Sequence, residues 1–282
     1  MIDRIHVIGA SGRSGAALCH SLLADGVPFA PVVRSAARWA ATGLPGTPSI
    51  ADLTDDSLRP ALAKAARVAS CAHARHIPTI LAAAPQADRF VFLGSTRKFT
   101  RWPDAHGGGV QAGETAFLAS GRSGVLLHPT MIYGAAGEDN VQRLAALLRR
   151  LPVVPLPGGG RALVQPIHQS DVTRCLRAAL DVAWDGPHSM VIAGPEAMAY
   201  KVFVRAVAKA AGLRAPRTVP VPAALLHALS PLTALPGLPR IRADEVRRLM
   251  EDKAFSIDAM RCTLRIDPIS LPAGLEMTFG GP

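Results

Sequence analysis

The chain is poor in residues on which several classes of protein depend. Its 282 residues include only two tyrosines and three tryptophans. Proteins that stack nucleic-acid bases need more aromatic side chains than this, gathered with basic residues on one face. The formal net charge of +10 suggests affinity for anions, but the basic residues are mostly arginines scattered along the chain. We therefore expect a small-molecule substrate and no nucleic-acid partner.

Cysteine is also scarce, and long apolar runs are absent. Cys19, Cys71, Cys175 and Cys262 lie far apart and form no Cys-x-x-Cys pair, so neither a metal site nor a disulfide framework is predicted. No run approaches the roughly 18 apolar residues that a transmembrane helix requires. A strand is predicted almost at once after the N-terminus, without a signal peptide. We expect a cytoplasmic protein with no transmembrane segment.

A glycine-rich turn near the N-terminus is the strongest motif. Residues 5–8 predict a strand, and GASGRSG then leads into an Ala/Leu-rich segment typical of a helix. Gly9 suits a tight turn, Gly12 permits close approach to a pyrophosphate, and Gly15 lets the helix lie close to the sheet. The helix N-terminus would face the phosphates. The same predicted site includes Ser11, Arg13 and Ser14.

The end of the second predicted strand, residues 27–33, favours NADP(H) over NAD(H). An acidic residue there would bind the ribose hydroxyls of NAD, whereas arginine pairs with a 2′-phosphate. The sequence has Arg34 and, one helical turn later, Arg38. The alternative is that both arginines only solvate a helix start. Asp52 and Leu53, after a short strand at 49–50, are predicted to border the adenine ring.

Later strand ends supply the remaining candidates. The carboxyl ends of parallel strands face the ligand crevice. After the predicted strand at 67–71, Cys71 and Ala72 are expected beside the cofactor. After the strand at 89–95, Ser95 and Thr96 are the best candidates to bind a substrate carbonyl or hydroxyl. The sequence then predicts a loop over 101–109, a helix over about 110–119 and a strand over 124–130.

Several motifs together resemble the extended and atypical short-chain dehydrogenase/reductase superfamily, in its NAD(P)-dependent epimerase/dehydratase-like branch. They are GASGRSG, FVFLGST, HPTMIYG, LPGGGRALVQPIHQSDV and EDKAF. The resemblance implies an α/β fold with a doubly wound parallel Rossmann sheet and a smaller, mostly helical C-terminal lobe. The NAD(P)-binding domain would span 1–150, completed by about 163–194, and the substrate lobe 195–282 with 151–162. By the same resemblance, Ser95 takes the position of the catalytic serine, and Pro129 and Tyr133 border the nicotinamide.

The sequence departs from this family at its catalytic pair, a tyrosine with a lysine four residues later. Four residues after Tyr133 and Tyr200 stand Gly137 and Val204. Alignment on Glu114 puts the tyrosine position near His106 and the lysine position near Val110, and valine cannot lower a neighbour's pKa. His106 and His128 are therefore candidate acids. The alternatives are a solvent-exposed loop residue for His106 and a buried or partner-binding residue for His128.

Three functions follow from these patterns. The first is an NADP(H)-binding oxidoreductase that acts on a small carbonyl or quinone-like acceptor without the Tyr-xxx-Lys pair, since hydride transfer needs little beyond orientation. The second is a catalytically silent NAD(P)-binding sensor or accessory subunit. The third is a nucleotide-sugar epimerase or dehydratase, least favoured because that chemistry depends most on the absent tyrosine. The sequence leaves a homodimer or a protein partner open.

Overall fold

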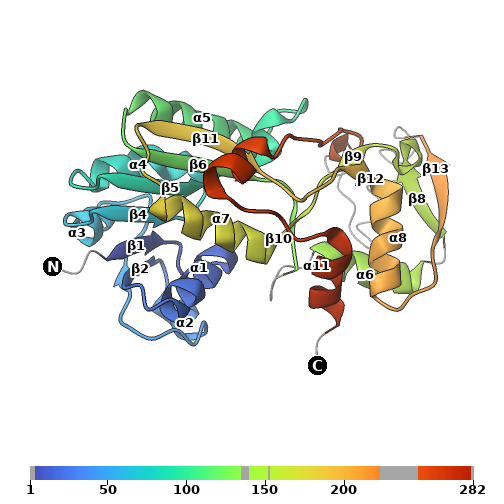
Figure 1. The fold of residues 1–282 in the computed structure, drawn as a ribbon, viewed down its shortest axis with the longest axis horizontal. Helices are drawn as coiled ribbons and strands as arrows, with labels where there is room; N and C mark the ends of the chain where they lie inside the picture. The colour runs from blue at the N-terminus through green and yellow to red at the C-terminus, as the bar shows by residue number, and fades with distance from the viewer. Residues whose placement is uncertain (1–3, 135–139, 152, 223–246, 281–282) are drawn as a thin grey trace.

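A seven-stranded parallel sheet forms the larger part of the molecule (Figure 1). The computed structural model describes residues 4–134, 140–151, 153–222 and 247–280. The strand order is β11-β6-β5-β4-β1-β2-β3. Their bounds are β1 Ile5–Ile8, β2 Phe29–Val33, β3 Ser49–Ile50, β4 Arg67–Ser70, β5 Arg89–Leu93, β6 Gly124–Pro129 and β11 Pro187–Ile192. The chain starts in the middle, winds outward to β3 and then returns to β4, so the order reverses between β1 and β4, where ligands bind in such sheets.

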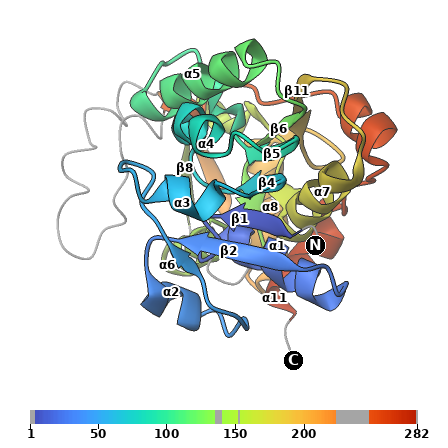
Figure 2. The same cartoon turned by 90° about the vertical axis from the view of Figure 1, so that its left-hand side faces the viewer.

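Helices cover both faces of this sheet (Figure 2). One face carries α1 Arg13–Ala24, α2 Ala36–Ala40 and α7 Gln169–Asp181, and the other carries α3 Leu58–Leu62, α4 Ile77–Ala83 and α5 Ala105–Ala119. Successive side chains of a strand point to opposite faces. In β5, Val91 therefore packs in the core under α1 and α7, while Phe90 and Phe92 pack under α3, α4 and α5. This burial on both faces explains the uninterrupted apolar sequence of the strand, and the predicted Rossmann fold is confirmed.

A smaller region lies at the carboxyl edge of the sheet, on the right of Figure 1. It contains α6 Asn140–Arg150, α8 Tyr200–Ala210 and α11 Leu271–Phe279, with the short strand pairs β8–β13, β9–β12 and β7–β10. Those strands are β7 Ile132–Tyr133, β8 Val153–Pro157, β9 Leu163–Val164, β10 Ile167–His168, β12 Met198–Ala199 and β13 Arg217–Val221. The expected boundary at residue 150 assigns α6 to the first domain, yet Val141 and Ala145 of α6 share a core with Phe203 and Val207 of α8. No helix within the described ranges is long and apolar enough to cross a membrane.

Helix α5 begins earlier than the sequence predicts. The predicted loop over 101–109 is wrong for its second half, because α5 starts at Ala105 and contains four glycines, three of them consecutive. Asp104 caps it, since its Oδ1 accepts hydrogen bonds from the N–H groups of His106 (2.9 Å) and Gly107 (2.8 Å). A Cβ on Gly107 would lie 2.7 Å from the Arg97 carbonyl oxygen, and one on Gly113 2.0 Å from that of Ala74. These glycines thus permit close helix packing, although glycine lowers helix propensity.

Candidate functional site

The glycine turn after β1 has the geometry of a phosphate cradle. Gly9 adopts a positive φ of 74°, and a Cβ on Gly15 would lie 2.1 Å from the Gly9 carbonyl oxygen. Only glycine therefore lets α1 start so close to β1. The Gly12 N–H donates to the Gly9 carbonyl (2.9 Å), and no side chain in the described part of the chain caps α1. The first amide groups of α1 thus remain available for an anion.

A first cavity of about 280 Å³ opens beside this turn, at the carboxyl ends of β1, β2, β3 and β4. Arg34 and Arg38 line it, and the Arg38 N–H donates to Ser35 Oγ (3.3 Å) at the start of α2. The predicted cofactor residues that the structure gathers in its wall are Gly9, Ser11, Gly12, Arg34, Arg38, Asp52, Leu53 and Cys71. Four others adjoin this wall in sequence without lining it: Arg13, Ser14, Gly15 and Ala72.

Asp52 brings one carboxylate into the first cavity. Its Oδ1 accepts hydrogen bonds from the hydroxyl (2.7 Å) and the N–H (2.9 Å) of Thr54. These hydrogen bonds, with a smaller contribution from the nearby Arg34, lower the pKa of Asp52. One oxygen of this carboxylate is therefore already engaged, beside the two arginines.

A second cavity of about 430 Å³ lies at the carboxyl ends of β5 and β6. Ser95, Thr96 and Thr130 line it. Thr130 is only 6% exposed, and its Oγ1 has no hydrogen-bond partner among the described residues. Ser95 Oγ accepts from the Arg97 N–H (3.1 Å) and keeps its own hydrogen to donate. The Thr130 Oγ1 atom is itself buried, so Ser95 supplies the hydroxyl with a hydrogen left to donate in this wall.

A polar network around the buried His128 ring fixes the main chain of Ser95. The Ser95 N–H donates to Nδ1 of His128 (3.2 Å), so the neutral ring carries its proton on Nε2. That atom faces Oε1 of Glu114 (3.3 Å) and Oγ of Ser189 (3.1 Å). Lys98 Nζ lies 2.5 and 2.6 Å from the two Glu114 oxygens. The ring of His128 is thus a fixed support for the end of β5.

The electrostatics of this network keep His128 neutral. The side chain is fully buried, and this burial lowers the pKa of His128 to about 4, against the partial opposing effect of Glu114. Burial alone would raise the pKa of Glu114, but hydrogen bonds from Lys98 and Ser189 outweigh it, and the pKa falls below its ordinary value. Glu114 is therefore ionised beside a neutral imidazole.

The other candidates near the nicotinamide end lie outside both cavity walls, as far as the described residues define them. His106 occupies the first turn of α5, with Nδ1 3.1 Å from Nε2 of His73. Burial lowers the pKa of both imidazoles, to about 4 for His73. Tyr133 is 1% exposed and packs on His168, while the carbonyl of Pro129 accepts from the Thr96 hydroxyl (3.1 Å). Catalytic roles for His106 and His128 stay predictions.

Sequence reasoning gave no site role to the segment Glu251–Phe255, which helps to wall the second cavity. The Glu251 carboxylate accepts hydrogen bonds from Thr100 Oγ1 (2.8 and 2.9 Å) and from the Arg101 N–H (2.6 Å). The same segment also forms hydrogen bonds with residues in and near β9. The Leu163 N–H donates to Asp252 Oδ1 (2.8 Å), and the Leu163 carbonyl accepts from the Lys253 N–H (2.8 Å). The Phe255 N–H donates to Gln165 Oε1 (2.8 Å). The only signal in the sequence was the EDKAF motif, which by itself indicates no contact.

Comparison with solved structures finds this fold in proteins whose structures contain a nicotinamide nucleotide. No protein-family model matches the chain, and no curated protein sequence matches it significantly. Among solved structures, the NADPH-dependent quinone oxidoreductase QOR2 of Escherichia coli, complexed with NADPH, has a TM-score of 0.77 at 18% identity, covering 98% of this chain and 99% of that one. The UDP-glucose 4-epimerase of Thermus thermophilus, in complex with NAD, has a TM-score of 0.73 at 19% identity and covers 98% of each chain.

A third neighbour is the UDP-glucuronic acid 4-epimerase of Bacillus cereus with UDP-glucuronic acid and NAD, with a TM-score of 0.74, 17% identity and 98% of each chain covered. The chain has their fold. The predicted resemblance to the extended short-chain dehydrogenase/reductase architecture is thus confirmed at the level of the fold. Fold alone does not identify a reaction, and these neighbours include both reductases and epimerases.

Proposed function

We propose that this chain is an NADP(H)-dependent oxidoreductase that reduces a small carbonyl or quinone-like acceptor. The observation that carries the proposal is the pair of cavities at one edge of the sheet. The first contains the glycine turn and Arg34, and the second contains Ser95 and Thr130. This edge is where doubly wound sheets bind dinucleotides. The pairing supplies a place for the nucleotide and a separate place for the acceptor.

The residues of the first cavity fit the nucleotide. The start of α1 would hold the pyrophosphate, because its first amide groups have no side-chain cap and Gly12 beside them lines the cavity. Arg34, Ser35 and Arg38 would hold a 2′-phosphate, and one Asp52 oxygen already accepts two hydrogen bonds from Thr54. This set supports NADP(H) over NAD(H), although the epimerase structures contain NAD.

The second cavity supplies orientation and one hydrogen-bond donor. The nicotinamide, when bound, supplies the hydride. The Ser95 hydroxyl can donate to an acceptor oxygen, and His128 fixes the main chain of Ser95 through its N–H group. No tyrosine lines either cavity in the described part of the structure. Activated acceptors suit such a site, because positioning contributes much of the rate.

The proposal is tested by the loss of NADPH absorbance with a panel of aldehydes and quinones. We expect turnover with at least one acceptor, and a Ser95→Ala variant should lose about 100-fold in kcat, as when one donor to a developing oxyanion is removed. NADPH affinity should stay unchanged in that variant. Ser120→Ala, at the end of α5 and outside both cavity walls, is the matched control. Binding of NADPH without oxidation by any acceptor would contradict the proposal.

That negative result would favour the second candidate, a catalytically silent NAD(P)-binding sensor or accessory subunit. The observation in its favour is the placement of both tyrosines away from the cavity walls, with Tyr133 buried against His168. It predicts tight retention of NADPH and a protein partner that stays bound through purification. A nucleotide-sugar epimerase is the third candidate, and interconversion of a UDP-sugar by the purified protein would support it.

A further inference from the structure

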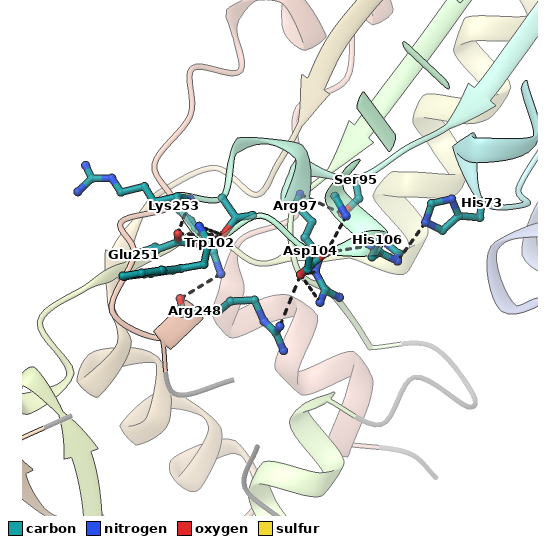
Figure 3. A network of polar contacts seen from close by, with 12 residues as sticks. His73, Ser95, Arg97, Trp102, Asp104, His106, Arg248, Glu251 and Lys253 are labelled. Carbon is teal, nitrogen blue, oxygen red and sulfur yellow. Dashed lines mark hydrogen bonds and ion pairs between the residues drawn. The ribbon is translucent and has the colours of Figure 1, made fainter. Parts of the chain in front are cut away.

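Three cationic side chains from distant parts of the chain converge at one end of the second cavity (Figure 3). Arg97 follows β5, whereas Arg248 and Lys253 come from the C-terminal segment. Oδ2 of Asp104 lies 2.7 Å from Arg97 Nε and 3.8 Å from Arg248 Nη1. Lys253 Nζ donates to the main-chain carbonyl of Arg248 (3.2 Å). We call Arg97, Arg248 and Lys253 the cationic cluster.

The acidic residues around the cationic cluster do not balance its charge. Among the residues that the structure describes, the nearest carboxylates are Asp104 and Glu251, so three cations face two anions. Both carboxylates also serve other donors: Asp104 caps α5, and Glu251 binds Thr100 and Arg101. Arg101 and Asp252, the other charged residues of the cavity wall, match each other in number. Counted over the described side chains, one positive charge is therefore left over at this end.

The environment of Lys253 reflects the same excess. Burial is the main cause that lowers its pKa, and Arg248 and Arg97 lower it further, while Glu251 alone among its neighbours raises it. Of its three N–H donors, one is used on the Arg248 carbonyl. Like charges gathered in a partly buried wall are costly unless an anion joins them. The cluster is therefore ready to pair with a negatively charged group.

An apolar wall adjoins this cluster. The rings of Phe99 and Phe255 lie 5.5 Å apart between centroids, and both line the cavity with Met131. Phe99 is 52% exposed, which is high for a phenylalanine. Ser95 and Thr130 belong to the part of the wall at the strand ends. The cavity thus combines a cationic end, an apolar side and a hydroxyl-bearing end.

We propose that the second cavity takes a carboxylic acid with an apolar body. Its carboxylate pairs with the cationic cluster, its body packs on Phe99 and Phe255, and its reducible group lies toward Ser95 and Thr130. A carboxylate fits better than a phosphate dianion because the excess over the described side chains is one charge. The reducible group rests on the proposed function, whereas recognition of the acid does not.

The test compares three aromatic probes of similar size in calorimetric titrations of the NADPH-saturated protein. They are benzoate, its neutral isostere benzamide, and phenyl phosphate. We expect benzoate to bind about 10-fold or more tightly than either of the others, as expected for charge-assisted hydrogen bonds. Lys253→Met should weaken benzoate about 10-fold and leave benzamide unchanged. Arg247→Met is the matched control, because Arg247 stacks on Trp102 and does not line the cavity.

Several outcomes would overturn this inference: benzamide binding as tightly as benzoate, phenyl phosphate binding more tightly, no binding of any probe, or Lys253→Met without effect on benzoate. A kinetic arm separates this inference from the proposed function. If 4-methylbenzaldehyde consumes NADPH as efficiently as 4-formylbenzoate, the oxidoreductase stands and the acid preference fails. If neither is reduced but benzoate binds through Lys253, the acid site stands and the reductase fails.

Discussion

The two cavities are built in different ways. The first is walled by residues between Ile8 and His76, which follow one another along neighbouring strands β1 to β4. The strand ladders and the turn at Gly9 fix the position of these segments through main-chain hydrogen bonds. The second draws its wall from Ser95 to Phe255 and depends on side chains such as Glu251 to join segments far apart in the sequence.

This difference indicates which substitutions should affect nucleotide binding and which should affect acceptor binding. A site made of backbone fails when the backbone cannot take its conformation, and the fold then suffers with it. A site whose segments are joined by side-chain hydrogen bonds can lose one of them while the protein stays folded, because each such bond contributes only about 1 kcal/mol to stability. We therefore expect substitutions to separate nucleotide binding from acceptor binding.

The largest effect is expected at Gly15. In Gly15→Ala the new Cβ would meet the Gly9 carbonyl at 2.1 Å, and backbone on both sides leaves no side chain to move aside. We expect a loss of about 3 kcal/mol or more in the free energy of unfolding and no measurable NADPH binding. Urea denaturation and cofactor titration measure both. Gly108→Ala is the control, because nothing lies within 4 Å of its Cβ and alanine favours a helix. Equal stability of the two variants would contradict the packing argument.

The next effect concerns pH and the support behind Ser95. Because the pKa of His128 falls from 6.5 to about 4 in the folded protein, the unfolded chain alone binds a proton there as the pH drops. The associated stability is present above pH 6.5 and is lost on going down to about pH 4, by about 3 kcal/mol. Urea denaturation across this range should show a shallower pH dependence in His128→Asn. His73 titrates in both proteins and cancels. Identical slopes would show that His128 is not held neutral.

A smaller effect is expected from the arginines of the first cavity. Arg34→Ala and Arg38→Ala should each weaken NADPH binding about 10- to 100-fold, because each removes a charged partner of a 2′-phosphate, and should leave NADH binding unchanged. Calorimetric titration with both nucleotides measures the difference. Arg59→Ala, an exposed arginine paired with Asp56 and outside the wall, is the control. An equal loss of NADH affinity would mean that the arginines do not bind the 2′-phosphate of NADPH.

The smallest effect is expected at Glu251. In Glu251→Gln one oxygen becomes a donor, so a hydrogen bond from Thr100 or Arg101 is lost. We expect KM for the acceptor to rise about 5- to 10-fold, equivalent to about 1 kcal/mol. The Kd for NADPH should not change. Steady-state kinetics measure KM for the acceptor, and nucleotide titration measures Kd for NADPH. A change in Kd for NADPH with no change in KM would contradict the assignment of Glu251 to the acceptor cavity.

The sequence predicted the sheet well, and several predicted cofactor residues line one cavity, because the signals for both are local. Strand β1, the glycine turn and α1 follow each other directly, and the arginine pair stands at the end of β2. Ligands gather where such strand ends meet. Knowing the order of strands was therefore enough to bring Gly12, Arg34 and Asp52 to one cavity.

The start of α5 and the second cavity could not be predicted in the same way. The run of Gly107, Gly108 and Gly109 resembles a loop, and the sequence alone does not reveal that Gly107 lies close to Arg97 and Gly113 close to Ala74. The approach of Arg248 to Asp104 joins residues 144 positions apart by number, through a contact that no periodicity reveals. Tertiary packing overrides local propensity in both cases.

The central claim is that the turn from Gly9 to Gly15 receives the diphosphate of NADPH. Calorimetric titration of the wild-type protein with NADPH tests it most directly, with Gly12→Val as the paired sample, since Gly12 is exposed and its Cβ would point toward the ligand space beside the Gly9 carbonyl. We predict one NADPH bound per chain by the wild type and none by the variant, with both proteins folded. Saturable binding of equal strength in the two proteins, or none in the wild type, would contradict the account.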